Sequence, residues 1–336
     1  MYTMARPRGK IEVVCQNPIC RYYLKEKGKD IIKSGKYKST GHQRFYCRHC
    51  KTYFMETKGT PLYRKQLSES EITDICKHLV EKNGIRSIER ITGHHRDTIG
   101  RLLEDMAEHA EAMNEYLIKN LRLTPFECDE LWSFVKKKQK KVELSSQNRS
   151  EEGDAYIYSG IKRNTYFFVA FSVGKWTQET CRRMIEKLSE RTEHPLPHTK
   201  IEIFSDGNDD YTYVLPDYYA DSCINYGQLV KIREKGTVIG KEKRVIYGNP
   251  DPGDIGTTDI ENFNGILRER NGRLVRKSKC FSKRKWRLEC SVQLFQFYWN
   301  FINEFKRRTS PAMLEGLADH LWIWHEFFYF SLTILD

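Results

Sequence analysis

Three acidic residues, Asp129, Asp206 and Glu261, have the types and surroundings that metal-dependent chemistry needs. Asp129 lies within an apolar segment, Asp206 follows a short apolar segment, and Glu261 stands at the head of a basic stretch. Carboxylates are ligands that Mg²⁺ and Mn²⁺ take, and two ions held by such acids can activate an attacking oxygen and stabilise a leaving one. Beside many cations, this set of acids predicts chemistry on the phosphodiesters of a nucleic acid.

The stretch that follows the third acid is strongly basic, with ten Lys or Arg residues against one acid between Gly265 and Arg287. Such a density of positive charge is typical of a surface that follows phosphates, and the guanidinium fork of Arg matches phosphate oxygens. On one continuous helix Arg273, Arg276 and Lys277 would share a face and form the preferred phosphate clamp. The DNA-binding residues that we expect in this stretch are Arg268, Arg270, Arg273, Arg276, Lys277, Lys279 and Lys283.

Four of the ten cysteines come as two close pairs: Cys15 and Cys20, then Cys47 and Cys50. Two such pairs can place four thiolates around one Zn²⁺ ion, which prefers tetrahedral sulfur ligands. His42 and His49 are alternative ligands. A strand-like segment follows the second pair, as in zinc ribbons, so we expect a small zinc-ribbon-like finger. The other cysteines lack paired spacing and are interpreted as reduced core residues.

The positive charge of the chain is concentrated at its N-terminal end. Residues 1–65 contain 16 Lys or Arg and 4 Asp or Glu, which accounts for the whole net charge of +12. A basic block of this kind usually faces a polyanion. We therefore interpret residues 1–65 as a zinc-finger DNA-binding region, with Arg44 and Arg48 as DNA contacts.

Residues 66–124 have the periodicity of short helices, and a capping box at Ser68 and Glu71 opens the first of them. Gly93 separates the second from a third that begins near His95, an arrangement typical of a helix-turn-helix module. A plain three-helix bundle gives the same periodicity and stays open as an alternative. At the start of the third helix we expect four DNA contacts: His95, Arg96, Thr98 and Arg101.

A third helix ending near Ala107 and a connecting helix over 106–123 lead to Pro125, where the pattern changes to α/β. Strands are expected over 126–135, 155–161, 166–173 and 201–204, with a helix over 178–191. This order is typical of a ribonuclease-H-like core, so we expect an α/β catalytic domain over 125–310 with a mixed five-stranded sheet flanked by helices. In that fold Asp129 and Asp206 would be neighbours on parallel strands.

Other acids adjoin the three candidates. Glu130 follows Asp129 on a predicted strand, where neighbouring side chains face opposite sides, so Glu130 should point away from the site. Asp259 lies two positions before Glu261 on a predicted helix and should also point away from it.

Residues 311–336 are rich in aromatic side chains and are expected to form a C-terminal helix that is buried or faces a partner. The apolar part, 321–335, is too short to span a membrane and contains His325 and Glu326. No export-signal pattern opens the sequence, so we expect a cytoplasmic protein with reduced cysteines and no membrane association.

These residues together resemble the transposases of the first-numbered (IS-one) family of insertion sequences, which carry an Asp-Asp-Glu (DDE) site. In the finger region the resemblance lies in the Gly-His-Gln-Arg run at 41–44 and the cysteines that follow it. In the catalytic region it lies in the segments 129–135, 206–207, 260–264, 267–268, 273–277 and 281–283.

The resemblance implies a DNA transposase that binds terminal inverted repeats, exposes a 3′-hydroxyl by hydrolysis and joins it to target DNA. It implies that Asp129, Asp206 and Glu261 are the catalytic acids and bind two Mg²⁺ or Mn²⁺ ions per active site. It also implies one structural Zn²⁺ on the four paired cysteines. The expected partner is double-stranded DNA, on which a homodimer or larger assembly would bring two transposon ends together.

Two other classes of protein fit the same residues. One is a DNA-binding regulator whose second domain is a degenerate catalytic scaffold, and metal-dependent cleavage separates it from a transposase. The other is a ribonuclease-H-like nuclease or resolvase that cuts without joining, and a strand-transfer assay separates that one.

Overall fold

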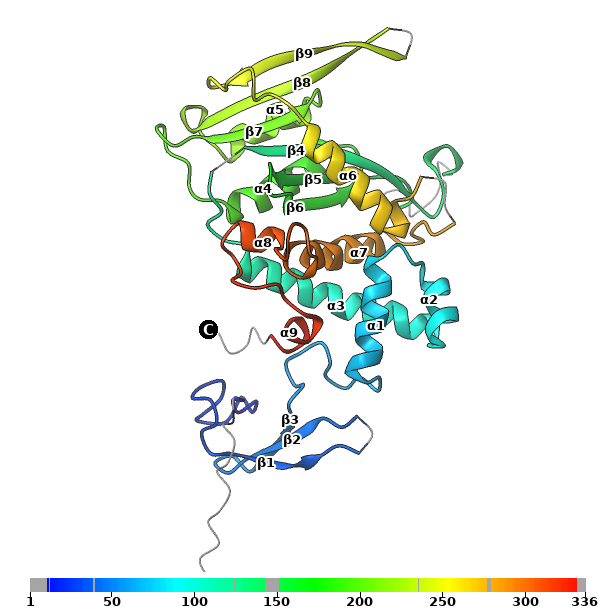
Figure 1. Ribbon diagram of the computed structural model, residues 1–336, viewed down its shortest axis with the longest axis vertical. Helices are drawn as coiled ribbons and strands as arrows, with labels where there is room; N and C mark the ends of the chain where they lie inside the picture. The colour runs from blue at the N-terminus through cyan, green and yellow to red at the C-terminus, as the bar shows by residue number, and fades with distance from the viewer. Residues whose placement is uncertain are drawn as a thin grey trace, which may run out of the picture. The chain divides into compact units, whose positions relative to one another are not determined.

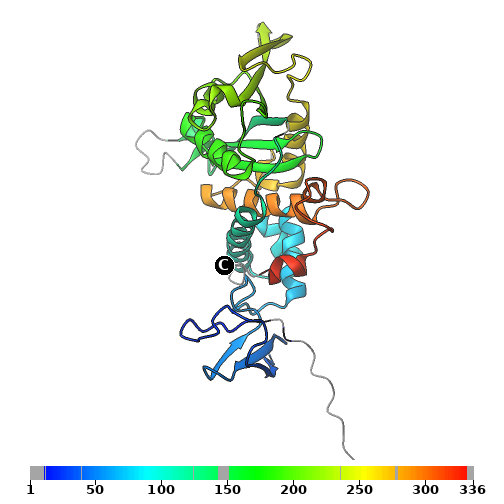
Figure 2. The same cartoon turned by 90° about the vertical axis from the view of Figure 1, so that its left-hand side faces the viewer.

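A computed structural model describes residues 11, 13–38, 40–123, 125–142, 151–234, 236–276 and 279–330 (Figures 1 and 2). The chain divides into two compact units: Met1–Asp74 with Ile323–Asp336, and Ile75–Trp322. The four-part division predicted from the sequence, with boundaries after 65, 124 and 310, stays a prediction.

The first unit contains a small antiparallel sheet of three strands, β1 (Ile31–Lys36), β2 (Gln43–Cys47) and β3 (Thr52–Met55), in that order. Phe45 on β2 is paired with Phe54 on β3, and their stacked rings, 5.8 Å apart, are buried. The strand predicted after the second cysteine pair is therefore confirmed. This core is small, so the unit has little apolar surface to hold it together.

The aromatic C-terminal segment does not form one helix over its described part. Two short helices, α8 (Pro311–Leu314) and α9 (Trp324–Tyr329), lie on either side of Gly316, whose φ of +73° belongs to the left-handed region. Glycine adopts this conformation at no steric cost, and it commonly follows a helix end. Residues 331–336 lie outside the described residues. Within the described ranges no helix has both the length and the apolar composition needed to cross a bilayer.

Three helices precede the large sheet: α1 (Glu69–Val80), α2 (Ile85–Thr92) and α3 (Arg96–Leu117). Helices α2 and α3 pack against each other, and Gly93, with φ +75°, ends α2 in the turn between them. The end predicted near Ala107 is wrong, because α3 continues without a break, and the predicted connecting helix ends at Leu117 and not at 123. Its buried residues keep helical spacing from Ile99 through Met113, so one apolar face runs through the predicted junction.

The second unit contains a mixed sheet of six strands in the order β6-β5-β4-β7-β8-β9. Strands β4, β5 and β6 pair antiparallel, β7 pairs parallel with β4, β8 pairs parallel with β7, and β9 pairs antiparallel with β8. The strands are β4 (Phe126–Val135), β5 (Gly153–Lys162), β6 (Phe167–Gly174), β7 (Ile201–Asp206), β8 (Ile224–Glu234) and β9 (Thr237–Tyr247).

The sheet has six strands and not the predicted five because β8 continues into a hairpin with β9. Gly236, with φ +85°, supplies the left-handed conformation that such a tight turn needs. Most side chains of β9 are exposed, and several of them are Lys or Arg. Charged side chains on an edge strand oppose its pairing with another sheet.

Helices cover both faces of this sheet (Figure 2). On one face an added Cβ at Gly160 of β5 would contact Met184 of α4 (Gln178–Arg191) and Cys128 of β4. On the other face α6 (Thr258–Arg270) packs against β4 and β5. Helix α7 (Lys285–Phe297) packs against α3 and β6. The remaining helical elements of the described residues are α5 (Asp210–Val214), a π-helical turn (Tyr298–Ile302) and four 3₁₀ turns (Gln139–Lys141, Leu215–Asp217, Asp221–Cys223 and Gly272–Leu274).

Gly272→Ala should destabilise the second unit by about 1–3 kcal/mol, the usual cost of overpacking. An added Cβ at Gly272 would lie 2.3 Å from the carbonyl oxygen of Lys82, and this backbone is itself held by a 2.6 Å hydrogen bond from Lys82 N to Arg270 O. Gly265→Ala is the matched control, because nothing lies within 4 Å of its added Cβ and alanine is the better helix former. Urea unfolding of both variants measures the difference. An unchanged midpoint for Gly272→Ala would contradict the close approach.

Candidate active site and cysteine cluster

The sheet brings Asp129 and Asp206 together. The parallel pairing of β4 with β7 matches Cys128 with Ser205, so the two aspartates follow at the next position of each strand. Residues at matched positions of parallel strands point to the same face. Asp206 is the last residue of β7, whereas Asp129 lies inside β4, and both side chains are only partly buried. The predicted neighbourhood of the two aspartates on parallel strands is confirmed.

Hydrogen bonds orient both aspartates. The Asn264 side-chain amide donates to Asp129 Oδ2 over 2.8 Å, and the backbone N–H of Glu130 donates to Asp129 Oδ1 over 2.8 Å. The backbone N–H of Asn208 donates to Asp206 Oδ1 over 3.1 Å. Asn264 lies one helical turn after Glu261, so this amide fixes helix α6 against the acid on β4.

Glu130 lies within the acidic cluster, contrary to the sequence prediction. One carboxylate oxygen from each of Asp129, Glu130 and Asp206 lies within 4.8 Å of the others. Neighbouring side chains of a strand lie on opposite faces of a sheet, and they stay apart only where the sheet continues on both sides of the strand. Here β7 ends at Asp206, and the turn after it brings Asn208 Nδ2 to Glu130 Oε1 at 2.9 Å. The cluster therefore reaches around the strand end from both faces.

Glu261 lies on α6, as predicted, but outside that 4.8 Å cluster of the described residues. Its Oε1 accepts a 2.6 Å hydrogen bond from the ammonium of Lys231 on β8 and a longer one from Thr257. The side chains of Lys231 and Glu261 are 30% and 40% exposed, so Glu261 has room to rotate. No sequence motif marked Lys231. Asp259, by contrast, accepts hydrogen bonds from the β5–β6 turn, which agrees with its predicted exclusion.

The electrostatics of the cluster favour a cation. Burial and the charge of Asp206 raise the pKa of Asp129 to about 6, and burial raises the pKa of Asp206. Burial and the charge of Asp206 raise the pKa of Glu130 to about 8. The ammonium of Lys231 opposes this rise, because its positive charge favours the ionised form of both aspartates. Crowded carboxylates with one lysine at their edge fit the oxygen ligands of a divalent ion.

The predicted clamp of Arg273, Arg276 and Lys277 does not lie on one helix face. Helix α6 ends at Arg270, and Gly272–Leu274 forms a 3₁₀ turn. The helix stops there because the glycine packs directly against the backbone after α1. Arg276 is exposed, and Lys277 lies outside the described residues.

Two other predicted phosphate contacts have partners within the protein. Arg268 donates to the carbonyl oxygens of Leu274, at 3.0 Å, and Trp132, at 3.1 Å. Arg270 donates to Asn303 Oδ1 at 2.6 Å. Both side chains therefore tie α6 to its surroundings, and their contact with DNA stays a prediction.

At the start of α3 the predicted DNA contacts differ in exposure. His95 caps the helix, with Nδ1 accepting from the Asp97 N–H at 3.3 Å. Arg96 and Arg101 are exposed and Thr98 is partly buried. The first two turns of α3 therefore offer two cations to a ligand.

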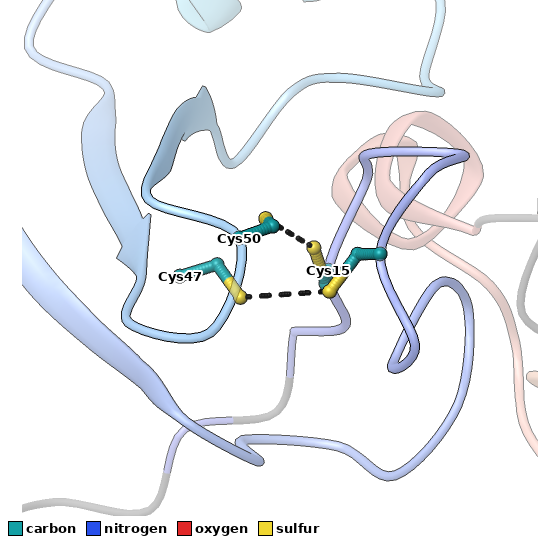
Figure 3. A group of neighbouring side chains, drawn as sticks. Cys15, Cys47 and Cys50 are labelled. Carbon is teal, nitrogen blue, oxygen red and sulfur yellow. Dashed lines mark hydrogen bonds between the residues drawn. The ribbon is translucent and has the colours of Figure 1, made fainter.

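The four paired cysteines form one cluster. Cys15 Sγ lies 3.6 Å from Cys50 Sγ, Cys20 Sγ lies 3.9 Å from Cys47 Sγ, and all four sulfurs lie within 4.8 Å of one another. Figure 3 shows the sulfurs of Cys15, Cys47 and Cys50 turned toward one another. Around Zn²⁺, with Zn–S distances of about 2.3 Å, tetrahedral sulfurs lie about 3.8 Å apart. The buried cluster therefore has the dimensions of a zinc site.

The alternative histidine ligands lie outside this sulfur cluster. His42 is buried and its Nδ1 lies 3.2 Å from Glu56 Oε1. His49 Nδ1 lies 3.5 Å from Cys20 Sγ, beside the cluster. Burial opposes ionisation of Cys50, yet hydrogen bonds from Thr52 and Asn17 lower its pKa to about 6, which favours a thiolate ligand.

Around the finger, Arg44 and Arg48 are both exposed. The guanidinium of Arg44 lies over the ring of Tyr53, 5.0 Å from its centroid, and its Nε donates to the carbonyl oxygen of Ser34. Both predicted DNA contacts are thus accessible on the surface of the first unit.

No model of a known protein family matches the chain, and no curated protein matches it at a significant level.

Proposed function

We propose that the chain is a DNA transposase of the DDE type with a ribonuclease-H-like catalytic domain. The observation that carries this proposal is the position of Asp129 and Asp206 at matched positions of adjacent parallel strands, beneath the helix that carries Glu261. The strand order β6-β5-β4-β7-β8, with three antiparallel strands followed by two parallel ones, supports it. Strand β9 is an addition at the edge of that order.

Asp129, Asp206 and Glu261 would hold the divalent ions, which supply charge neutralisation and Lewis acidity at the scissile phosphate. Asn264 holds the Asp129 carboxylate in place through its amide. Lys231 holds Glu261 at the edge of the cluster, and Glu261 would have to leave this contact to bind an ion. Glu130, bound by Asn208, supports the turn that follows Asp206.

The proposed reaction has two steps at this site. In the first, a water oxygen attacks phosphorus and the bond to the 3′-oxygen breaks, leaving a 3′-hydroxyl and a 5′-phosphate. In the second, that 3′-hydroxyl attacks a target phosphodiester and releases a target 3′-hydroxyl. One phosphodiester replaces another in the joining step, so no external energy source is needed.

The remaining parts of the chain would bind the DNA. The basic finger and the helices α2 and α3 would bind terminal inverted repeats. Two transposon ends must meet for joining, so we propose a homodimer or larger assembly on DNA. The exposed Arg48, Arg96 and Arg101 are available for these contacts.

A strand-transfer assay tests this function. The purified chain is incubated with Mg²⁺ or Mn²⁺, a labelled duplex from the ends of the DNA element that encodes it, and a target plasmid. We expect joined products that need the metal and disappear in Asp206→Asn. Metal-dependent cutting without joined products would indicate a nuclease or resolvase. Binding by a folded, zinc-loaded protein that neither cuts nor joins would indicate a regulator.

A further inference from the structure

A basic pocket of about 580 Å³ lies within the second unit, and its lining residues do not include the clustered acids. Its walls come from the starts of α2, α3 and α7 and from the segment between α6 and α7. Segments nearly two hundred residues apart in the sequence thus share one cavity. Six cations and one acid line it: Arg86, Arg96, Arg273, Lys279, Lys283, Arg287 and Asp97.

The walls of this pocket are packed together. An added Cβ at Gly84, which precedes α2, would lie 3.0 Å from Cys280 Sγ. An added Cβ at Gly100 on α3 would lie 3.1 Å from the guanidinium of Arg287 on α7. Arg287 also donates to Glu104 on α3 over 3.1 Å. These contacts hold the walls of the pocket together and fix Arg287. The side chains of Arg86, Arg96, Lys279 and Lys283 are exposed and available to a ligand.

Most of the pocket's positive charge lacks an acidic partner. Arg287 pairs with Glu104, and the Glu89 carboxylate accepts from the backbone N–H of Arg96 at 3.0 Å. Within the described part of the chain, however, no carboxylate lies at ion-pair distance from the side-chain nitrogens of Arg86, Arg96, Lys279 or Lys283. Like charges also face one another. Burial and the charge of Arg86 lower the pKa of Lys283. Burial and the charge of Arg287 together lower the pKa of Arg273 to about 10. A bound anion would relieve this repulsion.

The chemistry of the walls favours a phosphate over a base. Phe281 is the pocket's aromatic residue, yet the ammonium of Lys283 lies 3.4 Å from its ring centroid and the ring of Phe134 lies 4.8 Å away. Little of that ring is left for a base to stack on. Arginine forks and lysine ammonium groups are instead the usual ligands of phosphate oxygens.

We infer that this pocket binds backbone phosphates of double-stranded DNA, so that one strand is held by the start of α3 and by the segment before α7 at once. The DNA is that of the proposed function, and the inference rests on it for the identity of the duplex. The start of a helix-turn-helix third helix lies at the major groove, where the flanking phosphates are within reach. Helix α3, the pocket and the acids all belong to the second unit, so a duplex bound in the pocket would be held by the unit that carries the acids.

The test measures binding of a short fluorescent duplex by anisotropy, without divalent metal, between about 50 and 200 mM KCl. The variant carries Lys279→Gln and Lys283→Gln at two exposed positions, where loss of the contact between Lys283 and the Phe281 ring should lower the melting temperature only slightly and leave the fold intact. Arg122→Gln, an exposed cation outside the pocket, is the matched control. We expect the double variant to lower the slope of log K against log salt by about 1–2, while the control keeps it. Preference for one duplex sequence over another should persist, because phosphate contacts carry no base information.

Two outcomes would overturn the inference: an unchanged salt slope in the double variant, or tighter binding of duplex RNA than of duplex DNA. The strand-transfer assay tests the proposed function independently of the pocket. Joined products together with an unchanged slope would reject only the pocket. A reduced slope without metal-dependent cleavage would support the pocket and reject the transposase.

Discussion

Glu261→Gln should lower metal-dependent strand cleavage by a factor of about 10³ or more, whereas Glu130→Gln should keep cleavage within about tenfold of wild type. Both residues lie near the aspartate pair, but their surroundings differ. Glu261 is 40% exposed, and among described residues its partners are Lys231 and Thr257, so it can turn toward a metal. Single-turnover cleavage of a labelled duplex in Mg²⁺ measures the two rates.

Glu130 is already engaged in the fold. Its Oε1 accepts from Asn208, and burial and the charge of Asp206 raise its pKa to about 8. At neutral pH the carboxyl is therefore mostly protonated in the metal-free protein, and glutamine preserves both its shape and its lack of charge. We expect a change in stability within about 1 kcal/mol for Glu130→Gln.

Controls make the comparison decisive. Loss of the Glu261–Lys231 pair should cost only about 0–1 kcal/mol, because both side chains are partly exposed, so an inactive Glu261→Gln should melt like wild type. Duplex binding without metal should also be retained by both variants. Cleavage that is lost in Glu130→Gln and kept in Glu261→Gln would make Glu130 the third metal ligand in place of Glu261.

The elements around the site were predictable where local signals agreed with tertiary packing. Strand β4 and helix α4 match their predicted bounds of 126–135 and 178–191. Thr177 caps α4 by accepting from the Thr180 N–H, and the capping box at Ser68 and Glu71 forms as expected. Such signals lie within a few residues of one another, so a single sequence contains them.

Features that depend on where another segment ends were not predictable in this way. Glu130 joins the acids only because β7 stops at Asp206, and Lys231 reaches Glu261 only because β8 runs beside β7. Strand β9 has an exposed, charged face and lacks the alternation that marks a half-buried strand. The 3₁₀ turn that contains Arg273 results from a close approach of Gly272 to the backbone of Lys82, which is far away in sequence.

The other large effect concerns zinc. The purified chain should contain one Zn²⁺, and Cys47→Ser should lose it together with the fold of the first unit. The sulfur cluster is part of the small core around Phe45 and Phe54, and Cys47 is fully buried. A structural zinc ion contributes about 10–16 kcal/mol to the folding of such small domains, which is more than this core can replace.

Metal analysis, together with limited proteolysis of the first unit, measures both effects. Cys223→Ser is the matched control, because Cys223 is partly buried, lies in the second unit and stands outside the sulfur cluster. This variant should keep one zinc ion and a protease-resistant finger. A wild-type chain that folds with no zinc, or a Cys47→Ser variant that keeps the ion, would show that the close approach of the four sulfurs serves packing and not metal binding. Because the sulfur spacing already matches a zinc tetrahedron, we expect neither result.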